Sequence, residues 1–216
     1  GNIPQEQKWD ERYRNDILER YERLTREALA HHPDIIIWPE ASVPGMLGVD
    51  QPLTDRMIRL TREAGVPVLL GAPLLTEQRG EPRYTNSVVV LGPGGGIAAR
   101  YDKVHLVPFG EFVPLSDQWP WLREVLPPIG DFIPGREFTI FGLEGHKAWG
   151  KGRETGGEGN PRPVPPFAAL ICFEDVFPEL SRRFAREGAR VVVAPTAGES
   201  QGTKRKRSKN ESMHGS

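Results

Sequence analysis

The sequence predicts an α/β layered fold with a mixed β-sheet, and three observations carry this prediction. Apolar residues recur at helical spacing in two segments, and short apolar runs rich in β-branched residues alternate with them. One pair of these runs is joined by a glycine-rich turn. Alternating strands and helices favour parallel strands, whereas a tight turn joins antiparallel ones, so the sheet should contain both.

Two segments predict amphipathic helices. The first, residues 9–28, has apolar residues three or four positions apart with charged residues between them, at Trp9, Tyr13, Ile17, Tyr21, Leu24 and Ala28. The second covers about residues 54–64, and Gly65 is placed to be its C-terminal cap. A further helix start is expected at residues 175–179, where Pro178 falls in the first turn and acidic residues lie at the positive end of the helix dipole.

Short apolar runs predict strands at residues 34–38, 66–70, 87–91, 97–101, 167–172 and 190–194. Residues 92–96, Gly-Pro-Gly-Gly-Gly, form the expected hairpin turn. Residues 142–166 are rich in glycine, proline and charge, and predict a long loop. We therefore expect one domain over residues 1–199, C-terminally incomplete, followed by a disordered basic tail over residues 200–216.

Composition narrows the class of protein. A hydrophobic content of 38% and a charged content of 26% favour a globular chain over a disordered one. The net charge of −1 gives no electrostatic reason to expect a nucleic-acid partner. No apolar run approaches the roughly 20 residues that cross a bilayer. The polar start lacks the apolar region of a signal peptide. Because the chain also begins abruptly, without an initiator methionine, we expect a piece of a longer protein.

Three residues with complementary chemistry each follow a predicted strand: Glu40 in Trp38-Pro39-Glu40, Lys103 in Tyr101-Asp102-Lys103, and Cys172 in Leu170-Ile171-Cys172. In α/β sheets, ligands bind beyond the carboxyl ends of strands. A nucleophile, a carboxylate and an ammonium at that edge would form a complete set for acyl transfer. No metal or cofactor is expected.

The reaction explains each residue type. A free thiol, with a pKa of about 8.5, is mostly protonated at neutral pH and needs a base or a positive field. Glu40 could accept the proton, while Lys103 and the start of the following helix could supply the field. Lys103 and the backbone N–H of Phe173 are the natural donors to a tetrahedral oxyanion.

Each residue alone also has an interpretation without catalysis. A single cysteine ending an apolar strand is more often a buried structural residue. A glutamate after Trp-Pro could cap a turn, and a lysine after a strand is usually a solvated edge residue. Spacing and placement alone leave both interpretations open.

The local sequences resemble the three signatures of the nitrilase, or carbon–nitrogen hydrolase, superfamily, in its order of glutamate, lysine and cysteine. These are Ile37-Trp38-Pro39-Glu40, Tyr101-Asp102-Lys103 and Ile171-Cys172-Phe173-Glu174. Residues 105–114, His-Leu-Val-Pro-Phe-Gly-Glu-Phe-Val-Pro, and the opening Gly1-Asn2-Ile3-Pro4-Gln5 are similar to the apolipoprotein N-acyltransferase branch. The resemblance covers about residues 1–196, apart from the loop at 142–166.

The resemblance implies an αββα sandwich with mixed sheets and a role for each matching residue. Glu40 would be the general base, Lys103 the oxyanion-stabilising lysine and Cys172 the nucleophile. Glu111 and Glu174 would support the site, with Glu111 orienting Lys103 and the base; alternatively, Glu111 is a loop carboxylate bonded to nearby backbone N–H groups. Asn86 matches an asparagine near the family's pocket.

The resemblance also implies substrates and a location. Members transfer an acyl chain from a membrane phospholipid to the N-terminal amine of diacylglyceryl-cysteine in a lipoprotein, through a cysteine thioester. They are bacterial inner-membrane proteins whose catalytic domain lies on the periplasmic side, held by flanking transmembrane helices. Residues 112–133 are rich in aromatic and aliphatic residues, including Trp119 and Trp121, and predict either a lipid-contacting arm or a helix and loop packed on the core.

The sequence departs from the family pattern after Thr196, where Ala197-Gly198-Glu199-Ser200 replaces an Asn-Asp-Ala-Trp-Phe-Gly-type stretch. The basic run at residues 204–209 predicts a solvated tail rather than a lipid or nucleic-acid tether. Two alternatives to the acyltransferase therefore stay open. One is a soluble amidase or nitrilase-type hydrolase, and the other is a truncated domain without catalytic activity.

Overall fold

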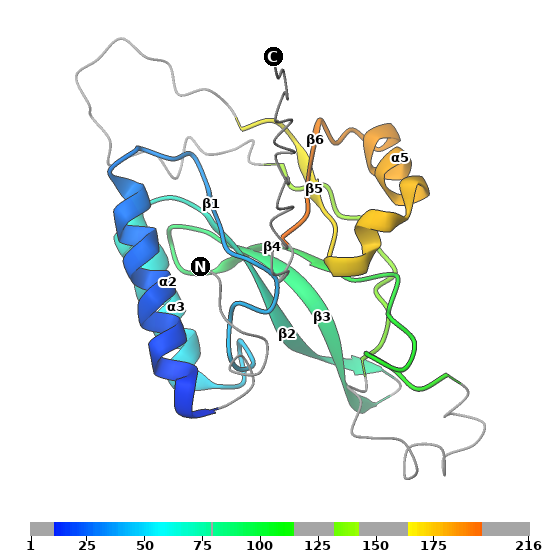
Figure 1. Ribbon diagram of the computed structural model, residues 1–216, viewed down its shortest axis with the longest axis horizontal. Helices are drawn as coiled ribbons and strands as arrows, with labels where there is room; N and C mark the ends of the chain where they lie inside the picture. Colours follow the sequence, from blue (N-terminus) through cyan, green and yellow to red (C-terminus); the bar gives the residue numbers. More distant parts are fainter. Residues whose placement is uncertain (1–10, 79, 115–131, 143–163, 196–216) are drawn as a thin grey trace, which may run out of the picture.

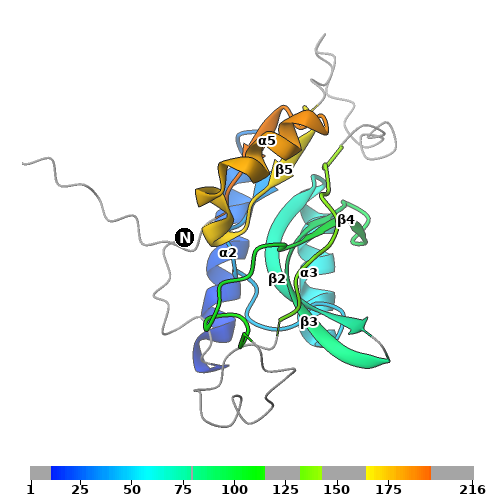
Figure 2. The same cartoon turned by 90° about the vertical axis from the view of Figure 1, so that its right-hand side faces the viewer.

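The computed structural model describes residues 11–78, 80–114, 132–142 and 164–195. These residues form four layers, in the order helices, sheet, sheet, helix (Figure 1). Helices α2 and α3 lie on one side of a four-stranded sheet, and the two-stranded sheet β5–β6 and helix α5 lie on the other. Figure 2, turned by 90°, places α5 and β5 in front of the larger sheet and the two long helices behind it. The αββα fold and the mixed sheet predicted from the sequence are both confirmed.

The larger sheet has the strand order β1-β2-β3-β4. The bounds are Ile36–Ile37 for β1, Val68–Gln78 for β2, Glu81–Leu91 for β3 and Ile97–Asp102 for β4. β1 pairs with β2 in parallel, and the other two pairings are antiparallel. The predicted turn at residues 92–96 joins β3 to β4 and is closed by a 2.9 Å hydrogen bond from the Gly92 N–H to the Gly96 carbonyl.

Side chains of the central strands alternate between two cores, because successive residues of a strand point to opposite faces. In β2, Val68, Leu70, Ala72 and Leu74 pack towards α2 and α3, whereas Leu69 faces β5. In β3, Val89 and Leu91 join the first core, and Val88 and Val90 join the second. The sheet is therefore buried on both faces, which accounts for the continuous apolar runs of its central strands.

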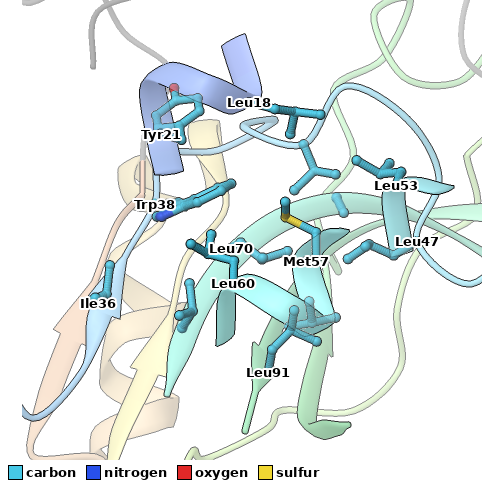
Figure 3. Close-up of a cluster of buried hydrophobic side chains, with 14 of the residues drawn as sticks. Leu18, Tyr21, Ile36, Trp38, Leu47, Leu53, Met57, Leu60, Leu70 and Leu91 are labelled. Carbon is cyan, nitrogen blue, oxygen red and sulfur yellow. The ribbon is translucent and has the colours of Figure 1, made fainter. Parts of the chain in front are cut away.

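The first core lies between the sheet and the helices α2 (Arg14–Leu29) and α3 (Gln51–Ala64) (Figure 3). Trp38, which follows β1, stacks on Tyr21 of α2 at 4.9 Å between ring centroids and donates a hydrogen bond to Thr25. The Asp50 side chain caps α3 by accepting from the Leu53 N–H, and Gly65 ends the helix in the left-handed conformation. The predicted C-cap at Gly65 is confirmed.

The second core lies between the two sheets and under α5. Strands β5 (Phe167–Ala169) and β6 (Val191–Val193) pair in parallel, and α5 spans Pro178–Arg186. Tyr101, Phe141, Leu180 and Phe184 are buried there with β5. Pro178 begins α5, as the sequence predicted.

The structure corrects the lengths of several elements. β2 and β3 are 11 residues each, about twice the predicted length, and β1 and β5 are shorter than predicted. The predicted long loop falls largely outside the described residues, as do the tail at 200–216 and most of the aromatic segment at 112–133. Among the described helices, none has the length and apolar composition to cross a membrane.

Candidate active site

Glu40, Lys103 and Cys172 emerge where three strands end. Glu40 follows β1, Lys103 directly follows β4, and Cys172 follows β5 and begins the short 3-10 helix η3 (Cys172–Val176). The structure brings the three side chains together. The Cys172 thiol and the Glu40 carboxyl each affect the pKa of the other, and the charge of Lys103 acts on both. Residues separated by 63 and 69 positions in the chain thus meet at one edge of the fold.

Burial contradicts two of the specific alternatives that the sequence left open for these residues. Lys103 is 1% exposed, so it is not a solvated residue at a strand edge. Cys172, in contrast, is exposed, so it is not a buried structural cysteine. Glu40 is buried, and its contacts are with side chains of the site. An accessible thiol beside a buried carboxylate and a buried ammonium is an arrangement that can support nucleophilic catalysis.

The surroundings of Glu40 shift the pKa of its carboxyl. Burial raises the pKa of its carboxyl, and Glu111 adds to this increase, while Lys103 and hydrogen bonds with Asn86 and Cys172 oppose it. A raised pKa brings a carboxylate closer to the acidity at which it can both accept and return a proton near neutral pH.

The Cys172 thiol is not activated in advance. Partial desolvation raises its pKa, and the negative charge of Glu40 raises it further, whereas Lys103 and the backbone N–H of Phe173 lower it. The expected contribution of a helix start is small, because η3 is a five-residue 3-10 helix and α5 begins only at Pro178. The surroundings of Cys172 therefore favour the neutral thiol over the thiolate.

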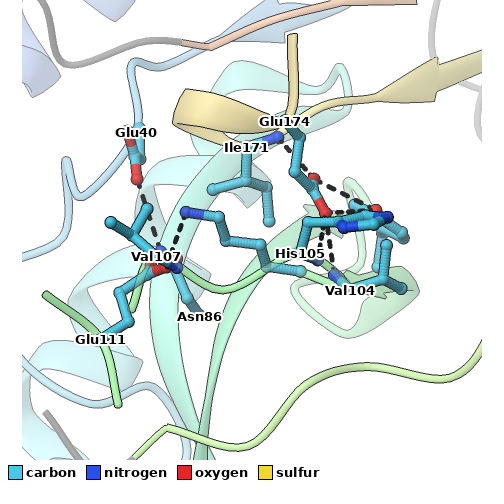
Figure 4. Close-up of polar contacts among 10 residues, drawn as sticks. Glu40, Asn86, Val104, His105, Val107, Glu111, Ile171 and Glu174 are labelled. Atoms are coloured by element: carbon cyan, nitrogen blue, oxygen red, sulfur yellow. Dashed lines mark hydrogen bonds and ion pairs between the residues drawn. The ribbon is translucent and has the colours of Figure 1, made fainter. Parts of the chain in front are cut away.

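Lys103 belongs to a chain of polar contacts that leads to Glu40. Figure 4 shows the part formed by Glu111, Asn86 and Glu40. Its ammonium lies 2.8 Å from the Glu111 carboxylate, which also accepts a 2.8 Å hydrogen bond from the Val107 N–H. The other Glu111 oxygen accepts from Asn86 at 2.7 Å, and Asn86 also donates to Glu40 at 3.4 Å. Glu111 therefore makes the contacts expected under both interpretations. It forms an ion pair with Lys103, and it accepts a hydrogen bond from a backbone N–H group.

Glu174 joins the nucleophile turn to the lysine loop. Its carboxylate is 0% exposed and accepts from the backbone N–H groups of Ile171, Val104 and His105, at 2.9, 2.8 and 3.1 Å (Figure 4). The Tyr101 hydroxyl donates to it as well, at 3.0 and 3.1 Å to the two oxygens. Burial and Glu174 raise the pKa of Tyr101, which therefore stays a donor. Glu174 supports the site by fixing the backbone on both sides of it.

Backbone strain gathers at the site. Among the described non-glycine residues, Ala41, Phe109 and Cys172 have φ values of 48°, 59° and 52°, and a fourth, His32, follows α2. Ala41 adjoins Glu40, and Phe109 lies in the loop that carries Glu111. Left-handed conformations disfavour side chains, and such strain clusters at functional sites.

One glycine allows the Glu40 turn to approach the sheet. A Cβ added to Gly71 of β2 would lie 2.9 Å from the Ala41 nitrogen and 3.1 Å from the Glu40 Cα. Both contacts are with backbone atoms, which a rotamer change cannot move. Gly71 is therefore part of what positions Glu40, a role that the sequence did not indicate.

The remaining predicted site residues have different outcomes. Phe173 follows the nucleophile, is 53% exposed, and forms an edge-to-face contact with Phe177, on which His105 stacks at 4.7 Å. Asn86 contacts both carboxylates of the site. Trp119 and Trp121 lie outside the described residues. Sequence reasoning missed the roles of Tyr101 and of the three backbone N–H donors to Glu174. The motif Tyr101-Asp102-Lys103 could have indicated Tyr101, whereas backbone donors leave no signal in the sequence.

The chain is similar to curated acyltransferases over most of its length. It is 36% identical over 194 residues to an apolipoprotein N-acyltransferase of Geobacter metallireducens, covering 89% of this chain and 34% of that protein. It is 34% identical over 197 residues to the enzyme of the same name from Methylococcus capsulatus, with the same coverage. The chain thus spans about a third of the length of these relatives.

Solved structures share the fold at low sequence identity. A cysteine-to-serine variant of the Nesterenkonia AN1 amidase, from the nitrilase superfamily, has a TM-score of 0.55 and 17% identity over 84% of this chain and 60% of that one. A carbon–nitrogen hydrolase from Helicobacter pylori has a TM-score of 0.57 and 18% identity over 85% of this chain and 55% of that one. The carbon–nitrogen hydrolase family profile matches residues 4–214. By its fold and its sequence, the chain belongs to the carbon–nitrogen hydrolase family.

Proposed function

We propose that this chain is the catalytic domain of an N-acyltransferase that works through a thioester on Cys172. The observation that carries the proposal is the meeting of an accessible thiol, a buried carboxylate and a buried ammonium at one sheet edge. Both relatives are named apolipoprotein N-acyltransferase, which supports the type of reaction. The substrates come from the family resemblance: a membrane phospholipid as acyl donor, and the amine of a diacylglyceryl-cysteine as acceptor.

In the first half-reaction, the Cys172 sulfur attacks the ester carbonyl carbon of the phospholipid while Glu40 accepts the thiol proton. The carbonyl oxygen becomes an oxyanion, which the Lys103 ammonium and the Phe173 N–H stabilise. The carbon–oxygen bond of the ester then breaks, and the departing lysophospholipid oxygen takes the proton from Glu40. The acyl chain remains on Cys172 as a thioester.

In the second half-reaction, the lipoprotein amine attacks the thioester carbonyl, and Glu40 accepts a proton from that nitrogen. The same donors stabilise the second oxyanion. The carbon–sulfur bond breaks, and the proton on Glu40 returns to the Cys172 sulfur. One amide bond has formed, one ester bond has been cleaved, and the site is restored.

The location follows from the substrates. A phospholipid donor and a lipoprotein acceptor place the reaction at the bacterial inner membrane, with this domain on the periplasmic side. In such a protein, anchorage is by helices that flank this domain. The exposed Phe173 and Phe109, 53% and 61% accessible, are apolar surface near the nucleophile and the Glu111 loop that an acyl chain could contact.

Intact-mass analysis tests the proposal directly. The chain is incubated with mixed micelles of phosphatidylethanolamine and a non-ionic detergent. We expect a mass increase of one acyl chain that persists in water and disappears when a diacylglyceryl-cysteine peptide with a free amine is added. The matched control is Cys172→Ala, which removes the sole thiol of the chain. The same adduct on this variant would contradict the proposal. The absence of an adduct on the folded wild type with any donor would also contradict it, and would favour a domain without catalytic activity.

A hydrolase is the second candidate, because the solved structures of this fold include an amidase. In a hydrolase, water resolves the thioester, with Glu40 accepting its proton. Rapid release of ammonia from small amides, in the absence of any lipid, would favour this function. The same assay with Cys172→Ala separates turnover at the site from background hydrolysis.

A further inference from the structure

Asn86 lies between the two carboxylates of the site. Its Nδ2 donates to Glu111 Oε1 at 2.7 Å and, over a longer 3.4 Å, to Glu40 Oε1 (Figure 4). The other Glu111 oxygen is taken by Lys103 and the Val107 N–H. Asn86 is thus the side chain that links Glu40 to the Lys103–Glu111 ion pair.

The chemistry of this position suits a primary amide. Two carboxylates offer only acceptors, and a side-chain NH₂ group has two N–H donors on one atom, so it can bond to both without adding charge. A hydroxyl has one proton to donate, and an ammonium would compete with Lys103 for Glu111. The acceptors on both sides also fix which end of the amide faces them.

The backbone of Asn86 serves the same arrangement. Asn86 belongs to β3, and its carbonyl accepts a 2.8 Å hydrogen bond from the Lys103 N–H, directly after β4 ends. The next residue, Ser87, donates to Asp102 at 2.6 Å, and this second contact also ties β3 to the residue before Lys103. One short stretch of β3 therefore fixes Lys103 through its backbone and Glu40 through a side chain.

We propose that Asn86 is a positioning residue for acyl transfer, which holds Glu40 beside Cys172 as an ionised base by tethering it to the Lys103–Glu111 pair. This inference rests on the proposed function insofar as Glu40 is the base of the reaction. It assigns Asn86 a role towards the protein's own carboxylates rather than towards a substrate.

The groups around Glu40 predict the direction in which its pKa should change when Asn86 is replaced. Lys103, Cys172, Asn86 and Glu111 are the groups that act on this carboxyl from the neighbouring elements. The hydrogen bond from Asn86 favours the ionised form, and the negative charge of Glu111 disfavours it. Loss of the amide should therefore leave two carboxylates that share one ammonium, and Glu40 should hold its proton to higher pH.

Alkylation of the single cysteine by iodoacetamide reports the ionisation of Glu40 without any acyl transfer. Because ionised Glu40 raises the pKa of the thiol, a plot of the logarithm of the alkylation rate against pH bends where Glu40 ionises. Rates are measured by intact mass from about pH 4 to about pH 9. The variant Glu40→Gln should show no bend, which identifies the titrating group.

In Asn86→Leu, we expect the bend to move up by roughly one pH unit. Asn86→Asp, whose side chain has the same shape, should move the bend in the same direction. This variant replaces Asn86→Leu in the test if the leucine variant does not fold. Asn86→Gln keeps an amide and should show the smallest displacement. A bend at the wild-type pH in both Asn86→Leu and Asn86→Asp overturns the inference, and so does a wild-type plot without a bend. If the wild type forms no phospholipid adduct but the bend is displaced in the Asn86 variants, the proposed function alone is refuted.

Discussion

The Lys103 ammonium and the Glu111 carboxylate lie 2.8 Å apart, with the lysine side chain 1% exposed and the glutamate 14%. Removing one partner of such a pair leaves a poorly hydrated charge unpaired. We expect Lys103→Met to lower the free energy of unfolding by about 3 kcal/mol. It should also slow acylation of Cys172 by about a hundredfold or more, as loss of an oxyanion donor does.

The double variant Lys103→Met/Glu111→Gln separates the two effects. With both charges removed, the free energy of unfolding in a denaturant titration should recover towards the wild-type value, while acylation should stay slow. A double variant that regains acylation would show that Lys103 acts only on stability.

Glu174→Gln tests the link between the nucleophile turn and the lysine loop. A glutamine has one acceptor oxygen, so it cannot satisfy the four donors that the carboxylate satisfies. Leaving a buried N–H unpaired costs about 1–3 kcal/mol, and we expect a destabilisation of at least this size. Hydrogen exchange at the amides of Ile171 and Val104 should accelerate. Glu179→Gln, at an exposed position in the first turn of α5, is the control, and equal stability of the two variants would contradict the role of Glu174.

Gly71→Ala should displace Glu40 without contacting its side chain. The added methyl group would contact the backbone of Glu40 and Ala41 at about 3 Å, so the turn must shift. We expect at least a tenfold loss of acylation rate, since small misplacements of a reacting group are costly. Gly96→Ala is the matched control, because nothing lies within 4 Å of its added Cβ. Similar rates for both variants would show that the turn tolerates the displacement.

Ser42→Ala should stabilise the protein. Ser42 is 1% exposed, and within the described residues its hydroxyl has no hydrogen-bond partner. Removing a buried, unpaired hydroxyl should therefore raise the free energy of unfolding, by about 1 kcal/mol. Ser87→Ala is the contrasting variant, because the equally buried Ser87 hydroxyl donates to Asp102 and its loss should destabilise. A destabilised Ser42→Ala would reveal a partner for this hydroxyl.

The raised pKa of Glu40 predicts how stability depends on pH. Burial is the main cause of the increase, so the folded protein keeps this proton to higher pH than the unfolded chain does. As pH rises from the ordinary carboxyl range through the raised value, ionisation therefore favours unfolding. Glu40→Gln lacks this titration. Its thermal midpoint, relative to that of wild type, should be lowest at about pH 4 and higher at about pH 8. The opposite trend would mean that the ionised form is favoured in the fold.

Local sequence patterns predicted the places of the elements better than their lengths. Gly65 marked the end of α3, and the glycine-rich turn at residues 92–96 marked the hairpin, because both depend on local backbone preferences. The predicted end of β2 at Leu70 was wrong, since Gly71-Ala72-Pro73 has low strand propensity but pairs with Ser87 and its neighbours in β3. That pairing is a tertiary contact, which overrides propensity.

The sequence indicated the ionisable residues of the candidate site but not the contacts that hold them. Glu40, Lys103 and Cys172 were candidates because each follows an apolar run at a strand end, and the structure brings them together. The contacts of Glu174 with three backbone N–H groups could not be found, since any residue except proline can supply such a donor. Asn86 was associated with the pocket, but its position between two carboxylates depends on the register of β3 with β4, which the sequence does not reveal.

The left-handed backbone of Cys172, with φ at 52°, has a consequence for how this turn can change. Glycine adopts this conformation without the steric penalty that any side chain incurs, about 1–2 kcal/mol. The least strained form of the turn would therefore carry no sulfur at all. At this position, backbone stability favours glycine, whereas the proposed reaction needs cysteine. A substitution to glycine would therefore relieve the strain and keep the fold, but it would remove the thiol.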